Sequence, residues 1–442
     1  MRRNTGQAIV KLMETLVIYS SDRDFTQRLY AALPKDITRR TSIHLVEPHL
    51  SILDTLKYEI PDVVLLGIGS NEDWFETFQK VDEDPWLEDT IFILVSPKAD
   101  EELFDHYRGF NIAYILDESR LEAQLPQVVE TLEKTKDLLN HSGLIQKITN
   151  LSGELVLDNN LMSVYYYASL FSNYLYREGY LSRSKRLALH LSLTELLVNA
   201  IEHGNAGITF EEKSEWLSKH RTIQALVEER LKRPENLGKL VRLQYSIGPM
   251  QSEFIITDDG DGFDTSIVKN LGKDVSLVHG RGILLSRKSV DKLEYNEKGN
   301  QVRLNIIHDG TAERQIPYGF VSQSPKEFQS GQVIFSENEP GDNLYYIVSG
   351  EYAVYVQGKR ITELSTRDIF MGEMGFLLGN RRSATVICTK PGKLVEISRE
   401  VFADAIRRYP NYGIFLLKTL AKRLREANLR YAGNADFSTS FR

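Results

Sequence analysis

Three polar side chains recur at four-residue intervals in the apolar stretch TELLVNAIEHGN, residues 194 to 205: Glu195, Asn199 and His203. Residues four and eight apart share one face of an α-helix, so these three form a polar stripe. Carboxylate and amide oxygens suit Mg²⁺ and its waters, and a Glu beside a metal-bound phosphate can serve as a general base. A solvated helix face explains the stripe equally well, so further motifs must decide.

Two glycine-containing stretches follow. In IITDDGDGFD, residues 255 to 264, a strand leads into Asp258, and Gly260 and Gly262 allow a tight turn that approaches a ligand closely. In HGRGILL, residues 279 to 285, Gly280 and Gly282 precede a helix, a natural cradle for phosphate. Each glycine pair alone is typical of a turn. The three elements in this order predict a nucleotide site.

This set resembles the ATP-binding fold shared by gyrase, histidine kinases and mismatch-repair ATPases, and most closely the bacterial anti-sigma factor serine kinases. ELLVNAIEHG is similar to their N box, DDGDGFD to their first glycine box and GRGILL…GNQVRL to their second, over about residues 151 to 309. The resemblance implies that Asn199 holds Mg²⁺, that Glu195 is the general base and that Asp258 binds the adenine amino group. The ATP-binding residues that it implies are Asn199, His203, Asp258, Gly260, Gly262, Gly280, Arg281 and Gly282, the last three in a lid over the phosphates.

Other phosphate chemistry is not indicated. There is no GxxxxGK[ST] loop. His141, followed by Ser142, is a poor phospho-acceptor and is expected to lie exposed at a helix end. A charged insert over residues 211–239 exceeds the short connection usual in the compact kinases, which leaves the shape of the partner surface open.

A second chemical cluster lies in FMGEMGFLLGNRRSATV, residues 370 to 386. Glu373 precedes Arg382 by nine residues, and Ser383 follows. An Arg at a turn with hydroxyl and backbone donors suits a phosphate, and a nearby Glu can accept a sugar hydroxyl. A surface Arg with a capping Glu is the alternative for this run alone.

With GQVIFSENEPGDNLYYIVSGEYAVY, this run resembles the cyclic-nucleotide-binding domain over about residues 321 to 431. The resemblance implies that Glu373 holds the ribose 2′-hydroxyl and that Arg382, with Ser383, holds the cyclic phosphate of cAMP or cGMP. Met371 is an extra residue before Gly-Glu, and Arg381 leaves a one-residue register alternative. The expected binding residues are Gly372, Glu373, Met374, Arg382, Ser383 and Thr385.

The first part of the chain alternates short apolar runs with helical stretches, a pattern typical of a parallel sheet. PDVVLLGIGS, residues 61 to 70, resembles strand three of a response-regulator receiver. Gly67 stands where that family has its phospho-accepting Asp, and Asp117 stands where it has Lys. Asp22 alone represents the acidic cluster, and Ser96 fits the hydroxyl position. Because phosphoryl transfer needs the carboxylate, we expect a receiver-like domain that is not phosphorylated in the usual way.

These patterns predict a multidomain α/β and α+β protein. The expected parts are a flavodoxin-like receiver domain (14–122), a linker helix (123–150), a GHKL ATPase α/β sandwich (151–312) and a cyclic-nucleotide-binding β jelly roll with a C-terminal helix (320–432). The linker helix is expected to open at Pro126. It either packs onto the first domain or dimerises.

Composition narrows the location and the partners. The 442 residues carry 54 basic and 61 acidic side chains, net −7, so there is no general attraction to nucleic acid. The single cysteine, Cys388, permits no internal disulfide and fits the cytoplasm. We expect no signal peptide, no membrane span and, with about ten residues after the last helix, no DNA-binding helix-turn-helix.

The sequence therefore predicts a cyclic-nucleotide-regulated, ATP- and Mg²⁺-dependent Ser/Thr protein kinase of the anti-sigma factor type. Its partner would be an anti-sigma antagonist or a sigma factor. One alternative is a non-catalytic switch that captures its partner when ATP and cyclic nucleotide bind. A scaffold with an empty ATP site is another. A homodimer through the 126–141 helix or the C-terminal helix stays open.

Overall fold

The computed structural model describes residues 13–139, 150–265, 290–309 and 313–434, except 70–71, 88–89, 98, 100–102, 104–105, 108 and 220–221. His141, Gly280, Arg281 and Gly282 lie outside the described residues. Within the described ranges, no helix is both long and apolar enough to cross a membrane. Four sheets form there, in three regions of the chain.

The N-terminal region, residues 13–139, is built on an all-parallel sheet in the order β2-β1-β3-β4-β5. This order is compatible with the predicted flavodoxin-like arrangement. The three inner strands are buried almost throughout, because helices cover both faces. The elements are β1 (Thr15–Ser20), α1 (Arg23–Ala31), α2 (Lys35–Arg40), β2 (Ser42–Leu45), α3 (Ile52–Glu59), β3 (Val63–Gly67), α4 (Phe75–Asp82), β4 (Ile91–Ser96) and β5 (Ile112–Asp117).

Helix α6 (Leu121–Leu139) starts earlier than the sequence predicts, and Pro126 lies inside it rather than at its start. Proline forfeits one helical hydrogen bond there. Burial outweighs this loss, because Leu121, Leu125 and Leu132 all pack into the core of the N-terminal region. The described apolar side chains of this helix therefore pack onto the preceding region of the same chain, which is the first of its two predicted alternatives.

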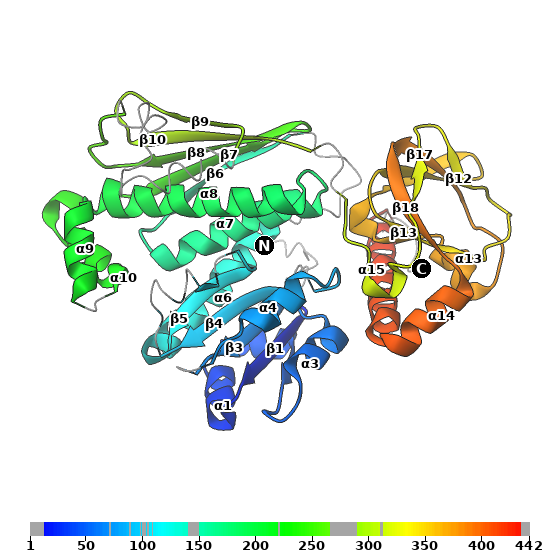
Figure 1. Cartoon of the computed structure of the whole chain (residues 1–442), viewed down its shortest axis with the longest axis horizontal. Coiled ribbons are helices and arrows are strands. Elements are labelled where there is room, and N and C mark those ends of the chain that lie inside the picture. The colour runs from blue at the N-terminus through cyan, green and yellow to red at the C-terminus, as the bar shows by residue number, and fades with distance from the viewer. Residues whose placement is uncertain are drawn as a thin grey trace, which may run out of the picture.

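The middle region, residues 150–309, is an antiparallel sheet in the order β6-β7-β8-β10-β9, with α7 (Leu161–Arg177) and α8 (Arg183–Asn199) on one face. Figure 1 shows these two helices between this sheet and the N-terminal sheet. Tyr166 of α7 stacks on Tyr114 of β5, with ring centroids 5.6 Å apart. The strands are β6 (Leu151–Leu157), β7 (Val241–Ile247), β8 (Gln251–Asp258), β9 (Lys292–Tyr295) and β10 (Gln301–Ile307); the charged insert forms α9 (Phe210–Ser218) and α10 (Ile223–Leu231).

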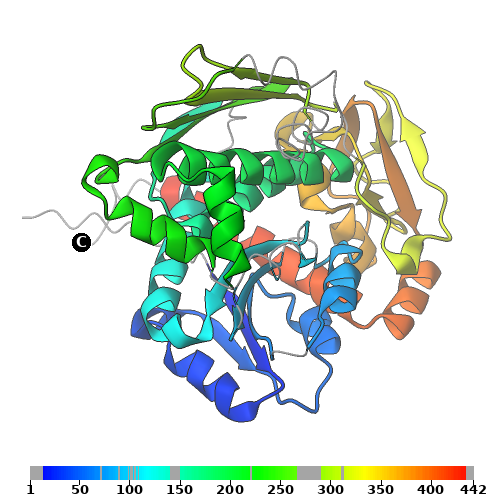
Figure 2. The ribbon, with the colours of Figure 1, turned by 60° about the vertical axis from the view of Figure 1, so that its left-hand side comes forward.

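The C-terminal β-roll, residues 313–434, has two four-stranded antiparallel sheets, β11-β18-β13-β16 and β12-β17-β14-β15. In Figure 2 its last helix, α15 (Asn411–Asn434), passes behind the N-terminal region. The other elements are β11 (Lys326–Phe328), β12 (Val333–Phe335), β13 (Leu344–Ile347), β14 (Glu351–Val356), β15 (Lys359–Leu364), β16 (Phe370–Met371), α13 (Glu373–Leu378), β17 (Thr385–Lys390), β18 (Gly392–Ile397) and α14 (Arg399–Arg408).

Candidate functional site

The last turn of α8 brings together Glu195 and Asn199. The Asn199 Nδ2 donates to Glu195 Oε1 at 3.3 Å. Leu193, Leu196 and Leu197 are buried behind them in the core of the middle region. The apolar residues thus fix the helix on the sheet, while the polar pair lies side by side as the four-residue spacing predicts.

His203 leaves this row because α8 continues into a π-helical turn, Ala200–Asn205. A π turn closes on the fifth residue rather than the fourth, which rotates later side chains out of register. The imidazole Nδ1 lies 2.6 Å from the carbonyl oxygen of Ile208, so this nitrogen carries the proton. Burial lowers the pKa of His203. The structure therefore places His203 on the backbone of the following loop.

Asp258 ends β8 directly beneath the π turn and is 9% exposed. Its Oδ1 accepts from the backbone N–H of Gly260 at 2.9 Å. A Cβ on Gly204 would lie 2.4 Å from the Asp258 carboxyl carbon, and one on Gly260 would lie 2.3 Å from the carbonyl oxygen of Gly204. Only glycines allow this approach, so the N-box turn and the first glycine turn form one unit.

Asn205 is a positioning residue that the sequence analysis did not assign. It is fully buried. Its Oδ1 accepts from the Asp259 backbone N–H at 2.8 Å, and its Nδ2 donates to Asn159 Oδ1 at 2.7 Å. The sequence signal for this role was the position of Asn205 directly after Gly204, at the end of an apolar helix. It ties the helix end to the strand end.

Lys298 and Asn300, from the turn before β10, support the same loop from the other side. Lys298 Nζ donates to the carbonyl oxygen of Gly260 at 2.9 Å, and Asn300 Nδ2 donates to that of Asp258 at 2.9 Å. Gly262 has φ +81°, and a Cβ on it would lie 1.9 Å from the Lys298 carbonyl oxygen. These contacts fix the first glycine turn in place.

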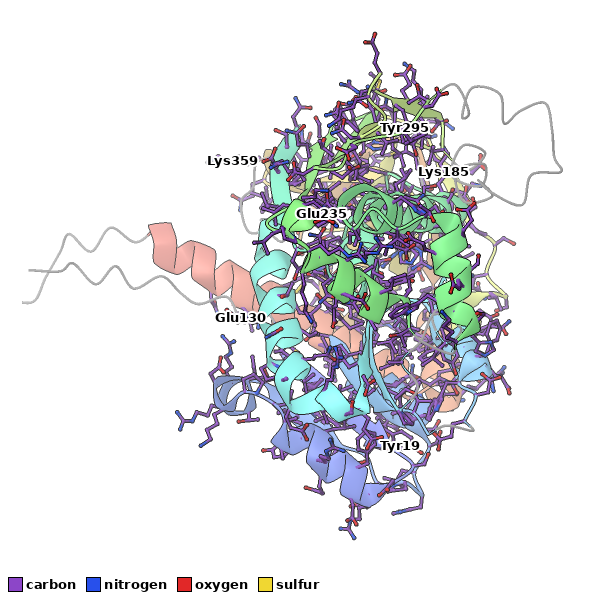
Figure 3. All side chains as sticks on the ribbon, turned by 90° about the vertical axis from the view of Figure 1, so that its left-hand side faces the viewer. Tyr19, Glu130, Lys185, Glu235, Tyr295 and Lys359 are labelled. Atoms are coloured by element: carbon purple, nitrogen blue, oxygen red, sulfur yellow. The ribbon has the colours of Figure 1, made fainter. Side chains whose placement is uncertain are left out.

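The electrostatics of this site suit a hydrogen bond from an uncharged N–H donor to the carboxylate of Asp258. Burial raises the pKa of Asp258 to about 6, against the opposing effects of the Gly260 N–H and Lys298. Burial also raises the pKa of Tyr295 on β9, and the charges of Glu195 and Asp258 raise it further. Figure 3 shows Tyr295 in the sheet of the middle region, far from Tyr19 of the N-terminal region. A buried carboxylate held by glycine turns fits the exocyclic amino group of adenine.

The oxygens of Glu195 and Asn199 fit Mg²⁺ only together with ligands from elsewhere. Within the described part of the chain, no cluster of three or more His, Cys, Asp or Glu side chains could hold a metal. Mg²⁺ is commonly bound by one or two protein groups, substrate phosphates and water. Glu195 and Asn199 would therefore hold Mg²⁺ only if nucleotide phosphates and water supply its other ligands.

A second site forms in the β-roll around Arg382, which is 4% exposed. Its Nη1 donates to the carbonyl oxygen of Gly372 at 2.9 Å, and its Nη2 donates to that of Asn343 at 2.7 Å. The guanidinium lies over the rings of Phe335 and Tyr345, at 4.3 and 5.6 Å from their centroids. Two carbonyls and two rings thus fix the fork at the start of α13.

The two adjacent arginines lie in different surroundings. Arg381 is exposed and donates to the carbonyl oxygen of Asn338 at 2.6 Å, away from Gly372. Met371, the extra residue, is fully buried in β16 and pairs with Tyr345 of β13. It extends a strand, and Arg382 is the arginine that lies against the Gly-Glu pair.

Glu373, the first residue of α13, is held by a residue that the sequence did not reveal. Arg423 of α15 donates to Glu373 Oε1 at 2.6 Å. Its other nitrogen donates to the carbonyl oxygens of Asp368 and Phe370, at 2.6 and 2.7 Å. Arg423 lies 50 residues away in sequence, so no local pattern could signal this contact.

The remaining predicted residues of this site have lesser contacts. The hydroxyl of Thr385 accepts from the backbone N–H of Glu337 at 2.9 Å. Ser383 is exposed, and Met374 is 51% exposed beside Glu373 on α13. Around Gly372, which has φ +78°, a Cβ would lie 2.6 Å from Arg382 Nη1. Glycine is therefore required there for the arginine to approach.

In the N-terminal region, the residues at receiver-like positions are engaged structurally. A Cβ on Gly67 would lie 2.7 Å from the Phe25 ring. Asp22 caps α1, accepting from the N–H of Asp24 at 2.8 Å. Asp117 Oδ1 accepts from the N–H of Ser119 at 2.7 Å, and Ser96 is buried. An aromatic ring therefore fills the space beside Gly67.

Comparison with known families matches both sites. Residues 160–306 match the histidine kinase-like ATPase domain, and residues 325–409 match the cyclic nucleotide-binding domain. The chain therefore carries a cyclic nucleotide-binding domain and a histidine kinase-like ATPase domain. The N-terminal parallel sheet lies outside both matches.

Similar proteins match over the β-roll. A CRP-like cAMP-activated global transcriptional regulator of Mycobacterium tuberculosis is 30% identical over 112 residues, which are 24% of this chain and 48% of the regulator. The cyclic AMP receptor protein of Thermus thermophilus is 29% identical over 128 residues, 28% of this chain and 59% of that protein. The crystal structure of the Thermus thermophilus catabolite activator protein is similar at 28% identity, covering 26% of this chain and 55% of that one, with a TM-score of 0.24. The chain thus spans less than two thirds of each.

Proposed function

We propose that the protein is a cytoplasmic, ATP- and Mg²⁺-dependent Ser/Thr protein kinase of the anti-sigma factor type, regulated by a cyclic nucleotide. Its substrate is an anti-sigma antagonist-like protein that serves a sigma factor. The observation that carries this proposal is the contact between the two halves of the ATP site. The turn after Glu195 and Asn199 lies against the buried Asp258 through Gly204 and Gly260.

In this proposal Asp258 accepts a hydrogen bond from the adenine amino group, and Asn199 holds Mg²⁺. When bound, Mg²⁺ neutralises charge on the transferring phosphoryl group. Glu195 takes the proton from the Ser or Thr hydroxyl of the partner as the hydroxyl oxygen attacks the γ-phosphorus. The bond between the γ-phosphorus and the β-phosphate oxygen breaks, and ADP leaves. The amide of Asn199, 3.3 Å from Glu195 Oε1, orients that carboxylate.

The β-roll supplies the regulatory site. Arg382 would bind the cyclic phosphate with Ser383, and Glu373 would bind the ribose 2′-hydroxyl of cAMP or cGMP. Arg423 already pairs with Glu373 and Arg382 already bonds to two carbonyl groups, so the ligand must compete with internal contacts. Such competition gives the ligand a different affinity for two states of the β-roll, which regulation requires.

The N-terminal region is, in this proposal, a receiver-like domain that has lost its phosphorylation chemistry. The Phe25 ring beside Gly67 supports this reading, because it fills the space that a phospho-accepting side chain would need. The region then serves as a structural connection rather than as a phosphate sensor.

A non-catalytic switch is the second candidate. The N-terminal region favours this candidate, because in this proposal it keeps the receiver-like fold but lacks the residue that would be phosphorylated. ATP would then only set the conformation that captures a partner.

The replacement Glu195→Gln separates the two candidates. It keeps the shape and the hydrogen bond from Asn199 but removes the base. We expect a fluorescent ATP analogue to bind as it does to the wild type, whereas ADP production with purified anti-sigma antagonist-like proteins is abolished. Unchanged ADP production by Glu195→Gln refutes the role of Glu195, and its absence in the wild type favours the switch.

A further inference from the structure

The turn between α4 and β4 places a residue of the N-terminal region inside the core of the β-roll. Trp86 is 4% exposed and belongs to the β-roll cluster. Its ring centroid lies 4.1 Å from that of Phe415, 5.3 Å from Tyr412 and 5.7 Å from Phe370. Phe415 and Tyr412 lie on α15, so Trp86 is held mainly by the helix that also carries Arg423. A buried tryptophan side chain commonly contributes a large share of the stability of an interface.

The same turn contacts the ATPase domain. Asp82, the last residue of α4, pairs with Arg183 and Arg186 of α8, the latter at 2.7 Å. The Asp82 side chain is 14% exposed and that of Arg186 8%. Two cations on one sheltered carboxylate form a stronger link than an exposed ion pair. Trp86 and Asp82 are four residues apart, so one short segment touches both nucleotide-binding domains.

Helix α8 connects this contact to the ATP site. Arg183 and Arg186 lie in its first turn, and Glu195 and Asn199 lie in its last two turns. The 17 residues form one unbroken α-helix, which spans about 25 Å at 1.5 Å per residue. One unbroken helix therefore joins the Asp82 contact to the pair of Glu195 and Asn199.

Helix α15 makes the corresponding connection at the regulatory site. Arg423 bonds to Glu373, the group proposed to take the ribose hydroxyl. On the same helix, Lys418 donates to the carbonyl oxygen of Glu59, and Arg425 pairs with Glu14. This helix contacts α3 of the N-terminal region, behind which it passes in Figure 2. A ligand that removes Glu373 from Arg423 therefore acts on the helix that holds Trp86.

We propose that the segment from Asp82 to Trp86 couples the cyclic nucleotide site to the ATP site, with the N-terminal region as the connecting body. The inference rests on the proposed function and specifies its regulation. Cyclic nucleotide binding alters the contact of α15 with Trp86, and Asp82 passes this change to α8. The rival route is the covalent connection between the ATPase domain and the β-roll, whose chain is unaltered when only the side chains of this segment change.

The test compares the coupling of two ligands in the full-length chain. Calorimetry gives the Kd of cAMP with and without saturating Mg·ATP for the wild type, Asp82→Asn and Trp86→Phe. Asp82→Asn keeps the shape of the side chain and removes the charge that Arg183 and Arg186 share. Trp86→Phe keeps a ring in the β-roll core and limits the risk of misfolding. The matched controls are Asp36→Asn, from an exposed pair with Arg40, and Phe75→Leu, a half-exposed ring.

We expect both Asp82→Asn and Trp86→Phe to bind each ligand alone with a Kd within about twofold of the wild-type value. The ratio of the cAMP Kd values with and without Mg·ATP should be at least about threefold closer to one than in the wild type. The two controls keep the wild-type coupling. Wild-type coupling in both test variants overturns the proposed route. If the wild type itself shows no mutual effect, the regulatory part of the proposed function falls and this route with it. If neither cAMP nor cGMP binds, the assignment of Arg382 falls, and the proposed route falls with it.

Discussion

The Cβ position of Gly204 lies 2.4 Å from the carboxyl carbon of Asp258. Real Cβ atoms do not approach another atom this closely, so position 204 admits only glycine while Asp258 stays in place. Gly204 lies in the π turn that follows the helix with Glu195 and Asn199. Asp258, the residue proposed to bind adenine, is the last residue of β8. The proposed phosphate and base sides of the ATP site are therefore in direct contact with each other.

Replacing Gly204 by Ala is expected to weaken ATP binding by at least about tenfold, because the added methyl group displaces the Asp258 carboxylate. A fluorescent ATP analogue measures the loss, and circular dichroism checks that the chain still folds. The matched control is Gly248→Ala, at a turn of the same sheet where a Cβ would have only ordinary contacts at 3.4 Å. Equal affinity in Gly204→Ala and the wild type would contradict the proposed geometry.

ATP affinity is expected to fall as the pH drops below about 6. Burial raises the pKa of Asp258 to about 6, and its ionised form is the stronger acceptor for the adenine amino hydrogen bond. ATP binding therefore competes with protonation, and the affinity falls by up to about tenfold per pH unit below that pKa. Binding titrations between pH 5 and pH 8, about this value, test the point.

The variant Asp258→Asn is the control for this pH dependence. It should bind ATP more weakly at neutral pH and show a flatter profile, because the titrating acceptor is gone. A wild-type profile that stays level through pH 6, or an unchanged slope in Asp258→Asn, would assign the pH dependence to another group.

Arg382→Lys is expected to reduce cAMP affinity at least about tenfold, although the positive charge is kept. Lysine cannot reproduce the planar fork that reaches the carbonyl oxygens of Gly372 and Asn343 and stacks on Phe335. Arg381→Lys is the matched control, since Arg381 is exposed and donates to a different loop. Calorimetric titration of both variants measures the difference. The opposite ranking would shift the register of the site by one residue.

Restoring a carboxylate by Gly67→Asp is not expected to restore phosphorylation of the N-terminal region. The Phe25 ring lies 2.7 Å from the position of the new Cβ, so the side chain must displace the ring or the strand. We expect a lower melting temperature and no phosphate incorporation from acetyl phosphate with Mg²⁺, detected by mass spectrometry. Incorporation at position 67 would show that the receiver-like site retains more of its chemistry.

Local patterns predicted much of this architecture. The apolar runs after Thr15 became β1, β3, β4 and β5, and the four-residue spacing of Glu195 and Asn199 placed them in contact. These features depend on short-range periodicity, which a sequence displays directly. The order of the motifs in the middle region was equally visible, and that region matches the predicted ATPase family.

The contacts that join distant segments were not predictable from the sequence. Asn205 meets Asp259 across 54 residues, Arg423 meets Glu373 across 50, and Trp86 meets Phe415 across the whole ATPase domain. The π turn that moves His203 out of the stripe depends on such packing rather than on local preference. Pro126 lies inside α6 for a similar reason, since burial of the surrounding leucines outweighs a lost hydrogen bond.

The most direct test of the central claim is the calorimetric titration of cAMP, and then cGMP, into the wild-type protein with and without Mg·ATP. We expect ATP to change the affinity of at least one cyclic nucleotide by about fivefold or more, because both ligands shift the equilibrium between the same states of the protein. The effect must be reciprocal when ATP is titrated instead. Identical cyclic nucleotide affinities with and without ATP, or no binding of either, would contradict it.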